Sequence, residues 1–429
     1  MTDSPVARID AAPVLPHFAA LPPLSLYIHL PWCVRKCPYC DFNSHETNRD
    51  VPEEPYVDAL LTDLELALPS VWGRRIFTVF IGGGTPSLFS EAAIERLLSG
   101  VRARVPLAPD AEITLEANPG TFEREKFAGF RAAGVNRLSL GIQSFNREHL
   151  RALGRIHDEN EGRAATEAAL EIFGNVNLDL MYALPRQTPD EARADAAAAI
   201  AFSPPHLSFY QLTLEPNTLF HREPPVLPDE DAAAAIEDAV DAELARAGYH
   251  HYETSAHARA GRECRHNLNY WRFGDYLGIG AGAHSKLSFP DRIVRELRWR
   301  QPEQYLQQVD ARAPAQDSHA VSRADVGFEF MLNALRLNDG FPVALFAERT
   351  GFAITLVSEA LDAAEARGLI DRDHAWIKPT ARGRRFLNDL QEMFLPAAAD
   401  AELSGTARAP GGPVAAPRTV QPVVVQRFR

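Results

Sequence analysis

Between residues 24 and 212, short runs of β-branched and aromatic residues alternate with longer runs rich in Ala, Leu and Glu. Runs of the first kind favour strands, and runs of the second kind favour helices. The predicted strands are Leu24–Leu30, Ile76–Ile81, Glu112–Glu116, Arg137–Ile142, Asn177–Tyr182 and His206–Leu212. The predicted helices span residues 53–68, 90–103, 121–133, 158–173 and 188–201. Six strands joined by helices, without a Rossmann fingerprint, predict an α/β fold in which a parallel sheet forms a partial (β/α)6 TIM-like barrel.

The pattern changes after Leu212. A helix is expected over residues 229–247, whereas the Gly-, Tyr- and His-rich residues 249–289 are too irregular for another plain repeat. Residues 324–395 are mostly helical in pattern and include a small β-wing near 369–378, which predicts a smaller α-rich C-terminal domain. The expected division is a flexible lead (1–23), the barrel with its extension (24–300), the α-rich domain (301–395) and a disordered Pro-rich tail (396–429).

Composition excludes several classes of protein. The 429 residues carry a formal net charge of −13, which argues against a nucleic-acid-binding surface. No uninterrupted apolar run reaches the roughly 18 residues of a membrane-spanning helix. Residues 1–16 lack the basic and apolar segments of a secretory signal. Three of the four cysteines lie within eight residues, which indicates metal or redox chemistry in a reducing compartment rather than a disulfide framework. We therefore expect a cytoplasmic protein.

Cys33, Cys37 and Cys40 form a C-x3-C-x2-C pattern directly after the first predicted strand. Three thiolates on a short loop can converge on one inorganic centre. A structural zinc ion needs a fourth ligand, which His29 or His45 could supply. An ordinary [4Fe–4S] cluster takes four thiolates, so three would leave one iron open for the amino and carboxylate groups of S-adenosylmethionine. The residues alone leave both alternatives open.

Further polar residues come at the carboxyl ends of predicted strands, where a (β/α) barrel gathers its functional loops. The glycines of Gly82–Pro86 let backbone groups approach a ligand closely, although a tight turn before a helix would also explain them. Glu116, Gln143, Arg155 and Asp179 could be solvated surface residues. Together, two carboxylates, an amide and a guanidinium suit a ligand that bears hydroxyls, an ammonium and a carboxylate.

The cysteine pattern, with Tyr39 just before its last cysteine, resembles that of the radical S-adenosylmethionine superfamily. The opening LYIHLPWC is similar to that of oxygen-independent coproporphyrinogen III dehydrogenases and of the related HemW haem chaperones, and the resemblance extends from Leu24 to Leu395. It implies a partial (β/α)6 barrel and a [4Fe–4S] cluster on Cys33, Cys37 and Cys40. The positions that it assigns to S-adenosylmethionine and the surrounding cavity are Tyr27, Tyr39, Gly83, Gly84, Thr85, Glu116, Gln143, Arg155, Asp179, Leu212 and His284.

One departure separates the two related families. The dehydrogenases carry a fourth cysteine two residues after the third, where this chain has Phe42, and they have a longer segment before the first strand. The resemblance therefore favours a haem chaperone that carries the cluster and S-adenosylmethionine and delivers haem to respiratory haem proteins of the membrane. The alternatives are a dehydrogenase that oxidatively decarboxylates porphyrinogen propionates, and a zinc-stabilised barrel with no redox role.

Residues 264–271 read CRHNLNYW and resemble the H-N-x-x-Y-W signature of the HemW type. His266 offers an imidazole for axial coordination of haem iron, and Tyr270 and Trp271 offer flat apolar faces for the macrocycle. The alternative is a satisfied structural histidine among core aromatic residues. Other candidate haem ligands are Cys264, His250, His251 and His257.

Overall fold

The computed structural model describes residues 15–47, 50–120 and 123–396. Most of the expected lead, residues 1–14, and nearly all of the expected tail, residues 397–429, lie outside the described residues. The described part of the lead has no helix or strand, and the backbone N–H of His17 donates to the carbonyl of Gly351, 2.9 Å away, in the C-terminal part of the chain.

The six predicted strands are all present and lie side by side in parallel. They are β1 (Leu24–Leu30), β4 (Ile76–Gly83), β5 (Leu107–Ala117), β6 (Arg137–Gln143), β7 (Val176–Tyr182) and β8 (His206–Gln211). All seven residues of β1 and of β6 are buried, as expected for parallel strands that are covered on both faces. These strands belong to a twelve-stranded sheet whose two edge strands do not pair with each other within the described residues. The prediction of a partial rather than a closed barrel is confirmed.

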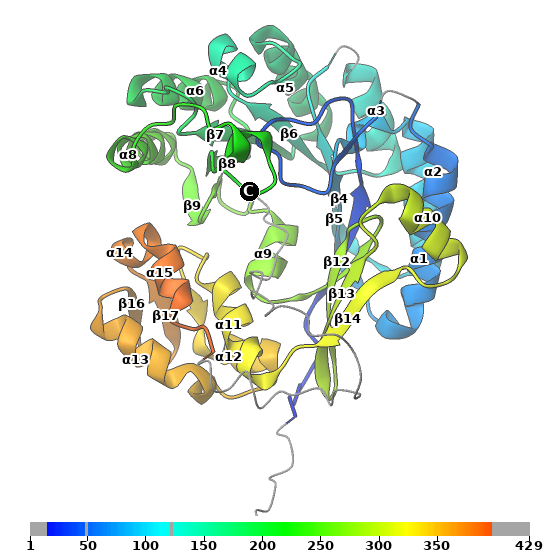
Figure 1. The fold of residues 1–429 in the computed structure, drawn as a ribbon, viewed down its shortest axis with the longest axis vertical. Helices are drawn as coiled ribbons and strands as arrows, with labels where there is room; N and C mark the ends of the chain where they lie inside the picture. Colours follow the sequence, from blue (N-terminus) through cyan, green and yellow to red (C-terminus); the bar gives the residue numbers. More distant parts are fainter. Residues whose placement is uncertain (1–14, 48–49, 121–122, 397–429) are drawn as a thin grey trace, which may run out of the picture.

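Helices cover the outer side of the curved sheet (Figure 1). They are α1 (Glu53–Val71), α2 (Glu91–Arg104), α3 (Glu123–Ala133), α5 (Glu159–Phe173), α6 (Pro189–Ala201) and α8 (Glu230–Arg246). Capping residues define where some of these helices begin. The side chain of Asp158 accepts hydrogen bonds from backbone N–H groups of α5, and that of Thr188 accepts one from α6, each in a complete capping box. The predicted helices are confirmed within the described residues. The short elements η1 (Pro86–Leu88), α4 (Arg147–Ala152) and α7 (Leu219–Arg222) were not expected, since they are too short to show a helical period.

The region expected to be irregular contains strands that extend both ends of the parallel sheet. Next to β8 lie β10 (Ala256–Ala258) and β9 (His250–Glu253), and next to β1 lies β11 (Asp275–Ile279), which is parallel to β1. Beyond β11 follow β12 (His284–Phe289), β13 (Arg292–Arg298) and β14 (Ala315–Ala320). Helix α9 (Arg265–Trp271) packs against β4 and β11, and α10 (Pro302–Asp310) packs against α1. Residues 302–320, assigned by sequence to the C-terminal domain, thus cover and extend the large sheet.

The C-terminal part has a hydrophobic core of its own, which includes Phe330, Phe346 and Leu390. Its elements are α11 (Arg323–Ala334), β15 (Phe341–Pro342), α12 (Val343–Thr350), η2 (Ile354–Val357), α13 (Ser358–Ala366), β16 (Ile370–Arg372), β17 (Trp376–Pro379), α14 (Ala381–Arg385) and α15 (Leu387–Glu392). The three short strands form the expected β-wing. Tyr270 and Trp271 of α9 belong to the same core, so α9 joins the sheet to the C-terminal helices.

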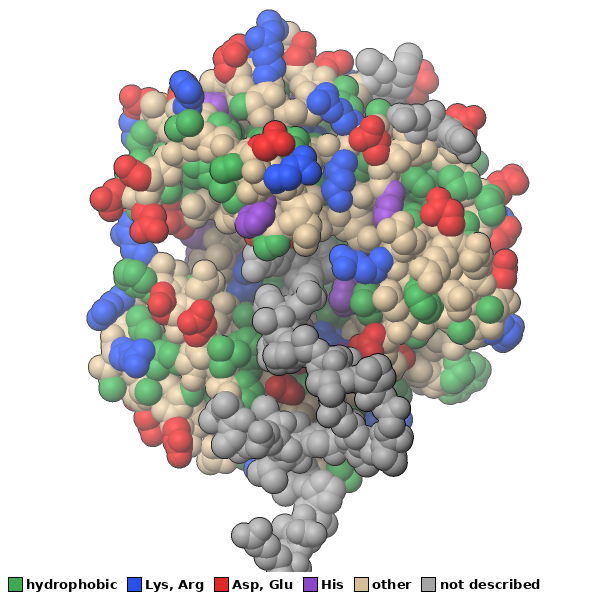
Figure 2. Space-filling view, viewed as in Figure 1, with side chains coloured by type: hydrophobic (Ala, Val, Ile, Leu, Met, Phe, Trp, Pro, Cys, Tyr) green, Lys and Arg blue, Asp and Glu red, His purple; other side chains and the backbone are tan. Residues whose placement is uncertain are grey.

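None of the helices formed by the described residues is long and apolar enough to cross a membrane. On the face shown in Figure 2, described Lys and Arg side chains are interspersed with Asp and Glu side chains.

Candidate functional site

The three clustered cysteines lie on the loop that follows β1. Two short strands, β2 (Trp32–Cys33) and β3 (His45–Glu46), close this loop at its base by parallel pairing. The backbone N–H of Thr47 donates to the carbonyl of Cys33 at 2.9 Å, and the N–H of Cys40 donates to the carbonyl of Cys37 at 3.1 Å. The loop is therefore held by its own backbone, with the three side chains on one short segment.

Each thiol has a polar partner at 3.5 Å, and two of these partners come from elsewhere in the chain. Thr85 Oγ1 contacts Cys33 Sγ, Arg155 Nη1 contacts Cys37 Sγ, and Ser44 Oγ contacts Cys40 Sγ. Burial raises the pKa of Cys33 to about 11 and also raises the pKa of Cys40. These buried thiols hold their protons tightly until a metal ion replaces the proton and offsets the cost of burying a thiolate.

The glycine run after β4 packs directly beneath the cysteine loop. A Cβ atom on Gly84 would lie 2.5 Å from the carbonyl oxygen of Trp32, so any side chain there would push the loop away. The N–H of Gly84 donates to the carbonyl of Leu30 at 2.8 Å, and the N–H of Thr85 donates to that of Trp32 at 2.8 Å. Gly83 has φ +124°, a conformation that favours glycine, and its N–H donates to Glu116 Oε2 at 3.1 Å.

A chain of polar contacts runs from Thr85 to Arg155 through Asn118. The side-chain amide of Asn118 donates to Thr85 Oγ1 at 3.0 Å, and Arg155 Nη2 donates to Asn118 Oδ1 at 2.6 Å. Arg155 Nη2 also donates to the carbonyl of Gly141 at 2.8 Å, while its buried Nε has no hydrogen-bond partner among the described residues. Sequence reasoning missed Asn118, although it follows Glu116 by two residues at the same strand end.

The two carboxyl groups of the site, Glu116 and Asp179, are half-buried near each other. Desolvation, followed by the charge of Asp179, raises the pKa of Glu116 to about 8. Desolvation also raises the pKa of Asp179, although Ser139 Oγ and Asn177 Nδ2 each donate to it at 2.8 Å. A cationic ligand beside these groups would favour their charged forms and so bind more tightly.

Gln143 has an unusual backbone conformation at the end of β6. Its φ is +67°, and the pairing of β6 with β7 shifts in register between Gly141 and Gln143. The hydroxyl of Tyr210 donates to Gln143 Oε1 at 2.7 Å. Non-glycine residues with positive φ are uncommon and cluster at functional sites, which agrees with the position of Gln143 in the pocket wall.

Most of the residues that the sequence assigned to cofactor binding line one pocket at the carboxyl ends of the parallel strands. They are Cys33, Cys37, Tyr39, Cys40, Gly83, Gly84, Thr85, Glu116, Gln143, Arg155 and Asp179. The wall also includes residues that were not singled out for binding: Arg35, Asp41, Phe42, Pro86, Ala117, Asn118, Ser139, Gly141 and Tyr210. The structure thus brings the predicted residues together, and the binding of a ligand by them stays a prediction.

Three of the predicted cofactor residues lie outside this pocket wall. The hydroxyl of Tyr27 lies 3.0 Å from Nδ1 of His29, and its ring packs against Phe80. Leu212 belongs to an apolar cluster against which Tyr39 packs. His284 is half-buried at the start of β12, where burial lowers its pKa to about 4.

Neither histidine considered as a fourth zinc ligand lines the pocket. His29 Nε2 lies 2.9 Å from the carbonyl oxygen of Asn43, and His45 Nε2 lies 3.3 Å from its side-chain oxygen. Two thiolates on one tetrahedral zinc ion would lie about 3.8 Å apart, given a Zn–S bond of about 2.3 Å. The three cysteine sulfurs do not all lie within 4.8 Å of one another. Among the described residues, Asp241, His251 and His257 are the group that meets this condition. At least one pair of the cysteine sulfurs is therefore farther apart than two thiolates on one zinc ion.

The residues proposed for haem lie inside the protein. His266 is fully buried, with Nδ1 2.7 Å from the hydroxyl of Thr78 and Nε2 3.0 Å from the hydroxyl of Tyr270. Burial lowers the pKa of His266 to about 3, so its ring is neutral. The ring of Trp271 is buried beneath the guanidinium of Arg336, 4.3 Å from its centroid. The structure brings His266 and Tyr270 together, with both ring nitrogens of His266 engaged within the protein.

The other candidate haem ligands differ in exposure. Cys264 is buried, its Sγ lies 3.7 Å from Glu112 Oε1, and burial raises its pKa to about 12. His250 is exposed and lies 2.7 Å from Asp339. His251 and His257 lie on neighbouring strands beside Asp241.

A partial (β/α) barrel with three cysteines on the loop after its first strand defines a radical S-adenosylmethionine protein. The model of the Radical SAM superfamily matches residues 27–199, and the model of the HemN C-terminal domain matches residues 321–386. The chain belongs to the HemW family of haem chaperones. It is 50% identical to the haem chaperone HemW of Escherichia coli over 377 residues, which cover 87% of this chain and 99% of the relative.

Other relatives and a solved structure agree with this assignment. Identity to HemW of Haemophilus influenzae is 48%, over 87% of this chain and 98% of the relative. Identity to HemW of Bacillus subtilis is 32%, over 86% of this chain and 99% of the relative. The structure of the Escherichia coli coproporphyrinogen III oxidase HemN, a radical SAM enzyme, matches with a TM-score of 0.75 at 27% identity, over 87% of this chain and 90% of that chain.

Proposed function

We propose that this protein is a cytoplasmic haem chaperone that binds haem and delivers it to respiratory haem proteins. The observation that carries the proposal is the 50% identity to a haem chaperone HemW, which extends over almost the whole length of that relative. In this proposal the protein also carries a [4Fe–4S] cluster and S-adenosylmethionine, which membership of the radical SAM superfamily implies.

The cysteine loop fits a cluster better than it fits a zinc ion. At least one pair of the sulfurs of Cys33, Cys37 and Cys40 is farther apart than two ligands of one tetrahedral ion, whereas a cubane distributes its thiolates over separate iron atoms. When bound, such a cluster offers one open iron to the amino and carboxylate groups of S-adenosylmethionine and can pass an electron to its sulfonium. Thr85 donates a hydrogen bond toward the sulfur of Cys33, the Ser44 hydroxyl lies beside the sulfur of Cys40, and Arg155 places a positive charge beside the sulfur of Cys37.

The remaining pocket residues fit the polar parts of S-adenosylmethionine. Arg155 has a buried Nε that lacks a partner among the described residues, so it can donate to a ligand carboxylate. Glu116 and Asp179 present carboxyl oxygens that suit an ammonium or ribose hydroxyls. The backbone of Gly83 and Gly84 lines the same pocket without side chains that would block the ligand.

For haem, the proposed ligand is His266, with Tyr270 and Trp271 as apolar contacts. The conformation described above engages both nitrogens of His266 with Thr78 and Tyr270. Coordination of iron by His266 therefore requires that one of these hydrogen bonds breaks and that α9 moves away from β4. Each of these hydrogen bonds contributes about 1 kcal/mol to stability, a cost that haem binding can offset.

The rival function is oxidative decarboxylation of a porphyrinogen, since the fold also matches that of coproporphyrinogen III oxidase. Phe42 stands where the dehydrogenases carry a fourth cysteine, and its side chain lies at the pocket with 42% of its surface exposed. A phenyl ring there provides neither a thiol nor a proton donor.

The deciding experiment is an anaerobic haem titration of the purified protein, with and without a reconstituted cluster. It is followed by transfer to an apo-haemoprotein and by an assay for vinyl product from coproporphyrinogen. We expect saturable haem binding, haem transfer and no vinyl product. Robust formation of vinyl product without haem binding would overturn the proposed chaperone function and support that of a dehydrogenase.

A further inference from the structure

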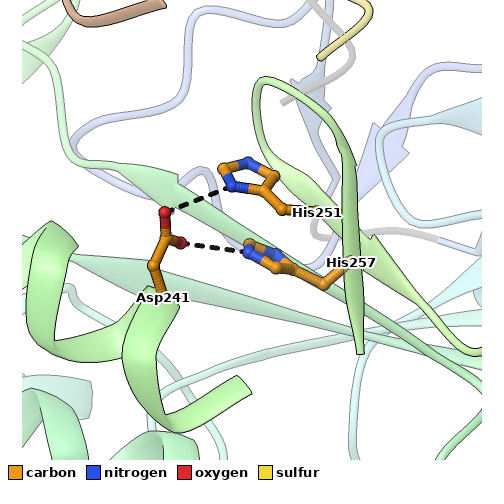
Figure 3. A group of neighbouring side chains, drawn as sticks. All are labelled: Asp241, His251 and His257. Atoms are coloured by element: carbon orange, nitrogen blue, oxygen red, sulfur yellow. Dashed lines mark hydrogen bonds and ion pairs between the residues drawn. The ribbon is translucent and has the colours of Figure 1, made fainter. Parts of the chain in front are cut away.

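A second group of metal-binding side chains lies at the edge of the large sheet, outside the cofactor pocket. Asp241 belongs to α8, His251 to β9 and His257 to β10, and Figure 3 shows the two imidazole rings facing the carboxylate. His251 and His257 are directly paired across the antiparallel strands. One ligand atom from each of the three residues lies within 4.8 Å of the others.

Each carboxylate oxygen of Asp241 faces one imidazole nitrogen. Oδ2 lies 3.2 Å from His251 Nδ1, and Oδ1 lies 3.0 Å from His257 Nε2. The two imidazole rings are stacked with their centroids 4.0 Å apart and their planes inclined by 23°. Three backbone elements thus deliver two imidazoles and one carboxylate to the same small volume.

The partners of His251 place an oxygen atom beside each of its ring nitrogens. His251 Nε2 lies 3.2 Å from the carbonyl oxygen of Thr254, and its Nδ1 faces the carboxylate, so both ring nitrogens face acceptors. A neutral imidazole has only one N–H. When that N–H donates to Thr254, the lone pair on Nδ1 points at a negative oxygen, and the contact becomes favourable when Nδ1 carries a proton or binds a cation that it shares with Asp241.

His257 supplies an independent observation. Its side chain is only 3% exposed, and its Nδ1 has no hydrogen-bond partner among the described residues. The polar contact that the structure does record for this buried ring runs from Nε2 to Asp241. The ring thus directs Nε2 into the group, whereas the Nδ1 atom that lacks a partner is not the one that faces Asp241.

We propose that Asp241, His251 and His257 bind one divalent ion of the zinc type. Zinc bonds of about 2.0–2.2 Å to nitrogen and oxygen place neighbouring ligands of a tetrahedral site about 3.3 Å apart. The two recorded separations, 3.2 Å from His251 to Oδ2 and 3.0 Å from His257 to Oδ1, each join an imidazole nitrogen to a different carboxylate oxygen and are close to this value. The carbonyl of Thr254 orients His251 through its other nitrogen, as outer partners of metal-bound histidines do. Three protein ligands leave one position for water.

The position of the site indicates a structural role. Strand β9 is the last strand of the large sheet and also contacts the C-terminal part of the chain. The N–H of Asn338 donates to the carbonyl of Tyr252 at 3.0 Å, and the N–H of Thr254 donates to that of Arg336 at 3.1 Å. An ion held by Asp241, His251 and His257 would fasten α8 to the hairpin of β9 and β10, whose first strand and turn make these contacts.

The test uses the full chain with its [4Fe–4S] cluster reconstituted, so that the clustered thiols are occupied. After brief chelation, the protein is titrated anaerobically with Zn²⁺, desalted and analysed for zinc, iron and sulfide. We expect one zinc per chain in the parent protein. Asp241→Asn, His251→Gln and His257→Phe should each weaken zinc binding at least tenfold with iron and sulfide unchanged. His250→Gln is the matched control, because His250 precedes His251 on β9 but pairs with Asp339.

A second measurement separates loss of the ion from loss of the fold. Zn²⁺ should raise the Tm of the parent and of His250→Gln, because an ion that binds only the folded state stabilises it, and should leave the Tm of Asp241→Asn unchanged. Circular dichroism without zinc checks that the variants fold. The proposal is overturned when the parent retains no zinc, or when folded Asp241→Asn and His251→Gln proteins retain as much as the parent.

Discussion

The guanidinium of Arg155 lies 3.5 Å from the sulfur of Cys37 through Nη1, and its Nη2 donates to Asn118 and to the carbonyl of Gly141. One side chain thus connects the cysteine loop after β1 with the ends of β5 and β6. Its buried Nε, which has no hydrogen-bond partner among the described residues, is the atom that we propose for a ligand carboxylate.

Replacing Arg155 by Gln should weaken S-adenosylmethionine binding at least tenfold in the cluster-loaded protein, because hydrogen bonds to charged groups contribute about 1.5–3 kcal/mol. Anaerobic equilibrium dialysis measures this affinity. Arg151→Gln is the control, since Arg151 is exposed on α4 and pairs with Glu148. Equal affinity of the parent and Arg155→Gln proteins for S-adenosylmethionine would show that Arg155 does not contribute to its binding.

The cluster should depend on all three clustered thiols and not on the fourth cysteine. Cys33→Ala, Cys37→Ala and Cys40→Ala proteins should each lose the broad iron–sulfur absorbance after anaerobic reconstitution. Cys264→Ala is the control, because Cys264 is buried beside Glu112 on the α9 side of the sheet. A full complement of iron and sulfide in Cys37→Ala would contradict the cluster assignment.

Gly84 should be required for cluster assembly because the cysteine loop rests on it. A Cβ atom in Gly84→Ala would lie 2.5 Å from the carbonyl oxygen of Trp32 and 2.8 Å from that of Pro31. The loop must shift to relieve this contact, so we expect a lower iron content and a lower Tm. Gly162→Ala on α5 is the control, since its Cβ would meet nothing closer than 3.8 Å and alanine favours helix. Normal reconstitution of Gly84→Ala would show that the loop tolerates the shift.

The sequence predicts the barrel well because its strands are covered on both faces. Leu24–Leu30 and Arg137–Ile142 are runs dominated by apolar residues, as expected for covered strands. In a parallel sheet, the carboxyl ends of the strands lie at the same edge, so the residues at those ends lie close together. Glu116, Gln143 and Asp179 therefore meet in one pocket although many residues separate them.

The other parts of the fold and of the candidate site depend on contacts between distant segments, which leave no pattern in the local sequence. Ser139 and Tyr210 lie inside strands among other polar residues, and the packed sheet is needed to show that these two line the pocket. Strands β9 and β10 have four and three residues, too few for a period to show. The burial of His266 depends on Thr78, which lies 188 positions earlier in the chain, so its hydrogen bond is invisible in the local motif.

Glu116 should make the stability of the ligand-free protein depend on pH. Its pKa is raised from 4.5 to about 8, so between these values the folded protein holds a proton that the unfolded chain has released. The free energy of unfolding therefore falls as pH rises from about 5 to 8, by at most about 1.4 kcal/mol per pH unit. Below pH 4.5 both states are protonated, and the contribution no longer changes.

Replacing Glu116 by Gln removes this titration. In urea unfolding at several pH values, the stability of Glu116→Gln relative to the parent should increase from pH 5 to pH 8. The exposed Glu125→Gln substitution on α3 should leave the pH profile of the parent unchanged. A constant difference between Glu116→Gln and the parent across this range would show that Glu116 titrates normally.

His266 should support haem binding without supporting the cluster. Replacing it with Ala removes the proposed axial donor, while Tyr270 and Trp271 still offer apolar contact, so haem binding should weaken and the Soret band should shift. Iron and sulfide contents should stay unchanged, because the cysteine loop lies on a different part of the sheet. His250→Ala, at an exposed histidine, is the control.

Because His266 Nε2 lies 3.0 Å from the Tyr270 hydroxyl, coordination also requires that this hydrogen bond breaks. Tyr270→Phe removes the hydroxyl and keeps the ring, so it should make His266 easier to engage and strengthen haem binding. Haem should in turn increase hydrogen exchange at the amides of α9. When His266→Ala instead binds haem with an unaltered spectrum and affinity, and Tyr270→Phe only lowers the Tm, His266 is a structural residue. The ligand would then be His250, His251, His257 or Cys264, and of these the exposed His250 reaches haem with the least rearrangement.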